Sequence, residues 1–178
     1  MSESISAASW GAIIAGAFVA ASLSVVLFVL GSGLGFASIS PWPHHGISAA
    51  MFTATAAIWL IVMQWIAAGI GGYITGRLRT KWVGTHIHEV FFRDTAHGLV
   101  MWSVATMPIA AAVSAASFAT MGRGAHAASI IVSADDYRLD ALFRAAGSAS
   151  STALSMLIGA FIASVSAVHG GRVRDLHL

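Results

Sequence analysis

Hydrophobic residues in this chain fall into four long blocks, not into the alternating or three-to-four-residue patterns of half-buried elements. A helix that crosses the hydrocarbon core of a bilayer needs about 20 mainly apolar residues. The blocks predict membrane-spanning helices over residues 9–37, 50–76, 96–119 and 148–168, and none carries Asp, Glu, Lys or Arg in its interior. The pattern predicts an all-α integral membrane protein with one four-helix domain over residues 1–178.

Composition supports this class. The chain is 57% hydrophobic and only 9% charged, whereas a soluble domain is about 45–50% apolar. Its mean hydropathy is +0.82. The absence of cysteine excludes disulfides, thiolate metal sites and a thiol nucleophile. Because the net charge is only +2 and the basic residues form no continuous stripe, we expect no nucleic-acid partner.

Most basic residues fall on one side of the predicted membrane. They lie in the loop predicted at residues 77–95 and in the tail after the fourth span: Arg77, Arg79, Lys81, Arg93, Arg172 and Arg174. Cytoplasmic loops are enriched in Lys and Arg. The distribution therefore predicts that both termini are cytoplasmic.

Two boundaries follow from local signals. In RDTAHG, Asp94 or Thr95 can cap a helix start, which predicts that residues 77–95 form a tight loop. In the outer loop predicted at residues 120–147, SADDYRLDALFR indicates a short amphipathic helix on the outer membrane interface. A helical extension of the fourth span is the alternative.

Small residues are expected to hold the spans together, because lipid gives helices no hydrophobic reason to associate. We predict close packing at Gly16, Gly72, Gly76 and Gly159. The segments GGYITGRLR and HGGRVRD end the second and fourth spans in the same way. They suggest two duplicated helical hairpins in one orientation.

Several residues are candidates for a pore or a hinge. The segment GSGLG is expected to loosen the outer end of the first span, and a proline is expected to kink the third. The fourth span carries a row of hydroxyls that form either a pore wall or interhelical contacts. The candidates are Gly31, Gly33, Gly35, Gln64, Pro108 and Ser155.

The charged segment between the second and third spans is a candidate binding surface. As a network of charges near the membrane, it suits a partner subunit or lipid headgroups through Arg77, Arg79, Lys81, Glu89, Arg93 and Asp94. Metal or haem binding is a less favoured hypothesis that would use His86, His88, His97 and His169. Because no HExxH motif or repeated Glu-x-x-His pair occurs, we expect no cofactor.

The blocks SWGAIIAG, LGSGLG with ISPW, GGYITGRLRT and EVFFRDTAHG resemble a family of small bacterial membrane proteins with four spans. The resemblance covers the first three spans and the charged segment. It implies the four-span architecture and a bacterial inner membrane, and it assigns no activity and no functional residue.

The sequence shows no nucleophile with a recognisable base and no buried carboxylate pair, so we expect no enzyme. The leading hypothesis is a non-enzymatic membrane protein that acts through helix association, as a small homo-oligomer or an accessory subunit of a larger complex. The alternative is an oligomeric channel or transporter for a small solute or ion.

Overall fold

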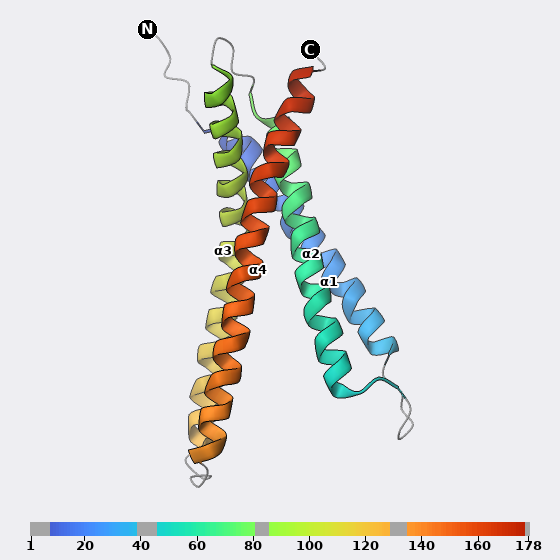
Figure 1. Cartoon of the computed structure of the whole chain (residues 1–178), viewed down its shortest axis with the longest axis vertical. Coiled ribbons are helices and arrows are strands. Elements are labelled where there is room, and N and C mark those ends of the chain that lie inside the picture. The colour runs from blue at the N-terminus through green and yellow to red at the C-terminus, as the bar shows by residue number, and fades with distance from the viewer. Residues whose placement is uncertain (1–7, 39–45, 81–85, 129–134, 177–178) are drawn as a thin grey trace. The chain divides into compact units, whose positions relative to one another are not determined.

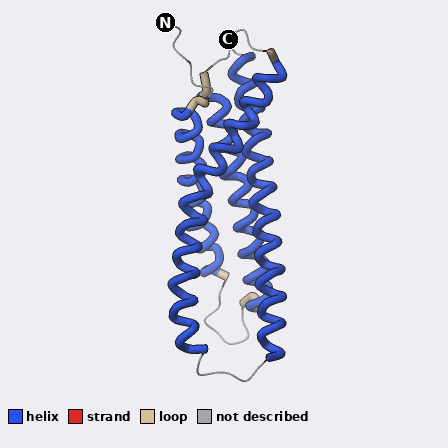
Figure 2. Tube along the Cα trace, turned by 90° about the vertical axis from the view of Figure 1, so that its left-hand side faces the viewer, coloured by secondary structure: helices blue, strands red, loops and turns tan. Residues whose placement is uncertain are grey.

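The regular structure of the described residues is entirely α-helical (Figure 2). The computed structural model describes residues 8–38, 46–80, 86–128 and 135–176. For residues 49, 112–113, 116–117, 119–128 and 135–149 it describes the backbone alone. The helices, in chain order, are α1 (Trp10–Ala37), α2 (Ala49–Leu78), α3 (Ile87–Ala128) and α4 (Asp135–Leu176), as Figure 1 shows.

Three of these helices are long and apolar enough to cross a membrane. They are α1, the Ala50–Leu78 part of α2 and the Ser150–Leu176 part of α4, with mean hydropathies of 2.7, 1.7 and 1.8. The predicted membrane class is thereby supported by length and composition. The fourth span, within α3, stays a prediction.

Local chemistry fixes the two ends of α2. Gly46 has a positive φ of 105°, in the left-handed region that favours glycine, so the chain turns there before the helix. Ser48 then caps the helix, and its side chain accepts a hydrogen bond from the Met51 amide at 3.2 Å. At the other end, the Arg79 amide donates to the Thr75 carbonyl at 3.2 Å.

The third helix begins earlier than the sequence predicts. It starts at Ile87, so most of the segment expected to be a tight loop is helical, and neither Asp94 nor Thr95 is its N-cap. The carbonyl of His86 accepts the first amide bonds, from Glu89 and Val90, at 3.0 and 3.1 Å. Glu89 stabilises this start, because an acid in the first turn suits the positive end of the helix dipole.

Two further expectations are corrected. The backbone of α4 is continuous from Asp135, so the stretch predicted as a separate short helix is the beginning of α4, which was the alternative. The segment GSGLG does not loosen the first span, because α1 remains helical through Gly31, Gly33 and Gly35 to Ala37. Gly31 lies against the Trp59 ring, a close contact that only glycine permits in this helix.

The chain forms two compact units, Met1–Ala105 with Ile158–Leu178, and Thr106–Leu157. The core of the first unit contains residues from all four helices. Its buried members are mostly small: Ile13, Ala17, Ala20, Ala68, Met101 and Ala163. Small side chains bring helix backbones close together, which is how helices associate in lipid.

Glycines make the closest helix contacts in this unit. A Cβ added at Gly76 would overlap the backbone of Ala167 in α4 and lie 2.8 Å from the amide nitrogen of Gly171. A Cβ at Gly72 would lie 2.9 Å from the Cα of Ala163. Two further close contacts join α1 to α2 at Gly16 and Gly71, and α3 to α4 at Gly98. No larger residue fits at these positions without moving a helix.

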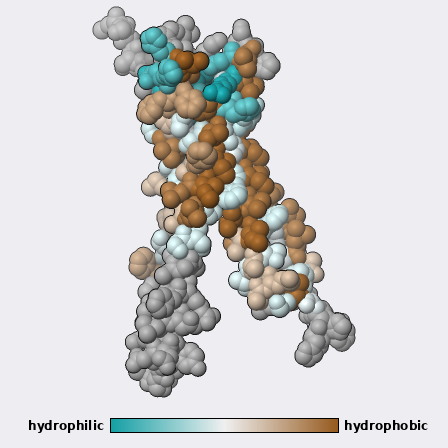
Figure 3. Space-filling model, in the orientation of Figure 1, coloured by the Kyte–Doolittle hydropathy of each residue, from teal (hydrophilic) through white to brown (hydrophobic). Residues whose placement is uncertain are grey.

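Large apolar side chains lie outward along the same helices. Phe18, Val25 and Phe161 are exposed, and Figure 3 shows apolar surface extending below a hydrophilic end. Such a surface is the side that a membrane protein turns to lipid.

We predict that Gly76→Ala lowers the free energy of unfolding in detergent micelles by about 1–3 kcal/mol, because the added methyl group overpacks the contact of α2 with α4. Gly33→Ala is the matched control, since Gly33 lies within α1 and has no neighbouring atom within 4 Å of an added Cβ. There the change is expected to stabilise the helix by about 0.5–1 kcal/mol. Equal effects of the two variants in a denaturant titration would contradict this packing.

Candidate functional site

Charged and hydrogen-bonding residues gather where α1 and α3 begin and where α2 and α4 end. We call this the polar end; it is the hydrophilic region of Figure 3. Its buried polar residues are Thr75, Arg79, Asp94 and His97. In a chain that is only 9% charged, this is the candidate functional site.

A buried ion pair joins the end of α2 to the beginning of α3. The Nε of Arg79 contacts Oδ1 of Asp94, and Nη2 donates a hydrogen bond of 2.6 Å to Oδ2. The side chains are 0% and 3% exposed. This two-point geometry matches the planar guanidinium to the carboxylate and is stronger than a single contact.

Burial raises the pKa of the Asp94 carboxyl above its ordinary value, while the hydrogen bond and positive charge of Arg79 act in the opposite direction. Asp94 lies just before the predicted third span. The charge of Arg174 also lowers this pKa and that of Asp175 raises it, but both act less than Arg79 does. Arg79 is therefore the group that keeps the charged carboxylate tolerable at this depth.

Arg174 of α4 binds the end of α2. Its Nη1 donates to the carbonyls of Arg79 at 2.8 Å and Gly76 at 3.3 Å. The last carbonyls of a helix lack partners within the helix, and a cation there also suits the negative end of the helix dipole. Asp175 in turn accepts from Nε and Nη2 of Arg174, at 3.0 and 2.7 Å.

His97 connects α3 to the start of α1. Its Nε2 accepts a hydrogen bond from the Ser9 backbone amide at 2.9 Å, and its Nδ1 lies 2.6 Å from the Arg93 carbonyl. Since Nε2 is the acceptor, Nδ1 must carry the proton and donate to Arg93. This arrangement requires the neutral imidazole with its proton on Nδ1.

The outer side of the polar end carries exposed aromatic and charged groups. Phe91 and Phe92 are 50% and 67% exposed, and Ile87 is 79% exposed. The Arg172 guanidinium lies 5.7 Å from the centroid of the Phe91 ring. Arg93 forms an i, i+4 ion pair with Glu89 at 2.7 Å.

The residues predicted as one binding segment therefore divide into two groups. Arg79 and Asp94 lie inside the molecule, where their charged groups bind each other. They therefore offer no surface to a partner. Glu89 is exposed and Arg77 and Arg93 are half-buried, so these three reach the surface. Lys81 lies outside the described residues.

The candidate metal ligands do not converge. Among the residues that the structure describes, no group of three or more His, Asp or Glu side chains is placed to hold a metal ion. Both ring nitrogens of His97 have protein partners. His169 lies beside the Tyr73 ring, with centroids 6.1 Å apart, and His86 and His88 are exposed.

The pore and hinge candidates occupy different surroundings. A Cβ at Gly159 would lie 3.1 Å from Nε2 of Gln64 and 3.2 Å from Nε1 of Trp102, so the absence of a side chain makes room for two polar groups from α2 and α3. Pro108 lies inside α3, and Ser155 is buried in α4. The channel hypothesis stays a prediction.

Sequence reasoning missed the structural roles of Ser9, Gly171 and Arg174. A Cβ at Gly171 would overlap the Asp94 carboxylate, so this glycine leaves the space that the ion pair occupies. The repeated Gly-Arg-x-Arg ending of α2 and α4 was a signal for Arg174, because it places a second arginine at the same level as Arg79.

Comparison of the chain with protein-family models, curated proteins and solved structures found no match. The resemblance to small bacterial proteins with four spans therefore stays a prediction. The function proposed below rests on the geometry of the polar end.

We predict that Asp94→Asn lowers the free energy of unfolding by about 3–5 kcal/mol, because the guanidinium of Arg79 would remain charged and buried without a counter-charge. Glu89→Gln, at the exposed pair with Arg93, is expected to cost at most about 0.5 kcal/mol. Denaturant titrations of both variants measure the difference.

The double variant Arg79→Met with Asp94→Leu provides a further control. Because the double variant removes both charges together, its loss of unfolding free energy is expected to be well below the sum of the losses in Arg79→Met and Asp94→Leu made singly. Additive losses, or an Asp94→Asn effect as small as that of Glu89→Gln, would contradict a buried, mutually dependent pair.

We predict that His97→Leu accelerates hydrogen exchange at the Ser9 amide by roughly 2- to 10-fold, the equivalent of one lost hydrogen bond of about 0.5–1.5 kcal/mol. His88→Leu, an exposed histidine on the same helix, should leave this amide unchanged. Hydrogen exchange followed by mass spectrometry of the peptide containing Ser9 provides the measurement. Unchanged protection in His97→Leu would refute this connection of α1 to α3.

Proposed function

We propose that this protein is a non-enzymatic membrane protein that acts by binding another subunit, either a second copy of itself or a subunit of a larger complex. The observation that carries the proposal is a group of apolar and charged side chains at the surface of the first turns of α3, joined by one arginine of α4. We call it the α3 surface; it consists of Ile87, Phe91, Phe92 and Arg93 of α3 and Arg172 of α4.

The internal bonds of the polar end make the α3 surface suitable for docking. In this part of α3, Asp94 is held by Arg79, and His97 is held by the Ser9 amide and the Arg93 carbonyl. A surface that is already ordered loses less conformational entropy when a partner binds. The first turns of α3 are therefore preorganised.

The composition of the α3 surface also favours a protein partner. Aromatic residues and arginine are enriched at the centres of protein interfaces. Phe92 and Ile87 are exposed ahead of the predicted third span, where large apolar side chains suit a partner or the membrane interface. Arg172, held over Phe91, adds a cation that an acidic group of a partner would match.

We further infer that α3 is a fourth span and that α1–α2 and α3–α4 are duplicated hairpins. The equivalent glycines of the two Gly-Arg-x-Arg endings, Gly76 and Gly171, lie against each other. Of the equivalent arginines, Arg79 pairs with Asp94 of α3, and Arg174 binds carbonyls at the end of α2. The concentration of basic residues at the polar end supports a cytoplasmic orientation in a bacterial inner membrane.

We predict that native mass spectrometry of the protein, extracted gently from its own membrane, detects it bound to a second polypeptide. Phe92→Gln should weaken that complex by roughly 30-fold, because truncation of a central interface residue costs about 2 kcal/mol or more. Leu176→Gln is the control, since Leu176 is 82% exposed at the same end but lies on α4 outside the α3 surface.

The masses distinguish the alternatives. A second copy indicates a homo-oligomer, whereas a different polypeptide in fixed ratio indicates an accessory subunit. A wild-type protein found only as a monomer with lipid would refute the proposal, as would equal loss of the complex in both variants.

A further inference from the structure

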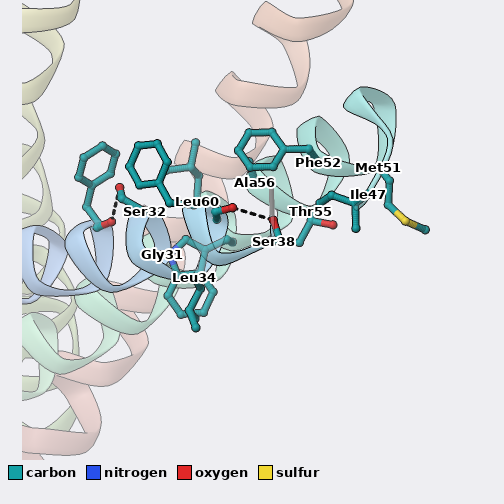
Figure 4. Close-up of a pocket in the computed structure, with 14 residues that line it drawn as sticks. Gly31, Ser32, Leu34, Ser38, Ile47, Met51, Phe52, Thr55, Ala56 and Leu60 are labelled. Atoms are coloured by element: carbon teal, nitrogen blue, oxygen red, sulfur yellow. Dashed lines mark hydrogen bonds between the residues drawn. The ribbon is translucent and has the colours of Figure 1, made fainter. Parts of the chain in front are cut away.

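An apolar pocket of about 560 Å³ lies between α1 and α2, far along both helices from the polar end (Figure 4). It is formed by the last turns of α1 and the first turns of α2, and the segment GSGLG contributes to its wall. The residues that define its shape are Gly31, Leu34, Gly35, Phe52, Ala56 and Trp59. Its volume is in the range of about 300–1,000 Å³ that is typical of small-molecule sites.

The pocket exists because small residues of α1 face aromatic residues of α2. Gly31 and Gly35 are one turn apart, and a Cβ at Gly31 would overlap the Trp59 ring, while one at Gly35 would lie 3.4 Å from the Phe52 ring. Ala56, between these two aromatic residues in α2, is too small to fill the space that remains. This accounts for the glycines that the sequence suggested as a hinge.

The polar groups of Ser32, Ser38 and Trp59 donate to backbone carbonyls of α1, and the hydroxyl-bearing Thr55 also belongs to the lining. The Trp59 Nε1 donates to the Leu27 carbonyl at 3.1 Å. The hydroxyls of Ser32 and Ser38 donate to the carbonyls of Phe28 and Gly35 at 2.8 and 2.7 Å, as the dashed lines in Figure 4 show. Among the described residues, those that line the pocket include no charged side chain and no histidine. They therefore suit hydrocarbon better than an ion.

The surroundings determine which hydrocarbon can enter. Both walls belong to helices apolar enough to cross a membrane, so the neighbouring medium is lipid. Phe28, Phe36 and Met51 beside the pocket are 55%, 74% and 61% exposed. These bulky side chains would keep the backbone of another helix away, because helices in lipid pack closely through small residues. A thin, flexible chain can pass between them.

We propose that this pocket binds one acyl chain of a membrane phospholipid. The site selects a chain by shape and apolar contact, with the Phe52 and Trp59 rings on α2 and the backbone of Gly31 and Gly35 on α1. It is separate from the α3 surface and does not depend on the function proposed for that surface.

The test uses the full-length protein in phosphatidylcholine liposomes that contain a small fraction of phosphatidylcholine with a photoactivatable diazirine in its acyl chain. After illumination, labelled positions are mapped by peptide mass spectrometry. We expect Phe52 and Leu60 to be labelled about tenfold more than Ile58, equivalent to a preference of ~1.4 kcal/mol. Ile58 is 63% exposed on the same helix but does not line the pocket.

Two variants give a matched comparison. Ala56→Phe fills the pocket and should reduce labelling of Phe52 and Leu60 to the level of Ile58. Ala57→Phe adds the same side chain at the neighbouring exposed position outside the pocket, and it should leave the wild-type pattern intact. If Ala56→Phe fails to fold, the labelling of Phe52 and Leu60 relative to Ile58 in the wild-type protein still tests the proposal.

Two results would overturn the proposal. Equal labelling of Phe52, Leu60 and Ile58 in the wild type would mean contact with bulk lipid only. Labelling of Ile58 without labelling of the pocket residues would mean that protein, from this chain or a second copy, occupies the space.

Discussion

The close approach of α2 and α4 at Gly76 and Gly171 is the constraint on which the polar end depends. Lipid supplies no hydrophobic force between helices, so they associate through packing and hydrogen bonds, and both require short distances between backbones. At this contact the backbones can meet because Gly76 has no side chain, and a Cβ there would overlap the backbone of Ala167. Gly171 also leaves the space in which Asp94 meets Arg79. A larger residue there would separate the helices and displace a buried charge.

Charge is tolerated inside the polar end because each buried group has a specific partner. Arg79 and Asp94 neutralise each other, and His97 is neutral, with both ring nitrogens bonded. Arg174 satisfies carbonyls that the end of α2 would otherwise leave without partners. A buried pair of this kind adds little net stability compared with apolar residues, but the loss of one member is costly. Its effect is to fix one arrangement of the helix ends.

The two proposed contact regions differ in chemistry because their surroundings differ. The α3 surface combines exposed aromatic rings with arginine at the polar end. The pocket between α1 and α2 has a mostly apolar lining, and the hydroxyls of Ser32 and Ser38 and the indole N–H of Trp59 donate to backbone carbonyls of α1. Polar recognition fits the first region, and hydrocarbon alone fits the second.

The sequence by itself determined the helical membrane class and the places where α1 and α2 begin and end, because runs of about 20 apolar residues have few alternatives. It failed at the start of α3. Judged from the neighbouring residues alone, Asp94 looks like a helix N-cap. In the folded chain it lies within α3 and pairs with Arg79 at the end of α2.

The same limit applies to the glycines and arginines. The sequence indicated that Gly72 and Gly76 favour close packing, but only the tertiary structure decided that α4 lies against them. It also decided that Arg79 is buried, whereas Arg172, from the equivalent ending, is exposed over Phe91. The length of an apolar run is a local property that can be read directly from consecutive residues. The partner of a charge or a glycine depends on which helices meet, and that depends on contacts between residues far apart in the sequence.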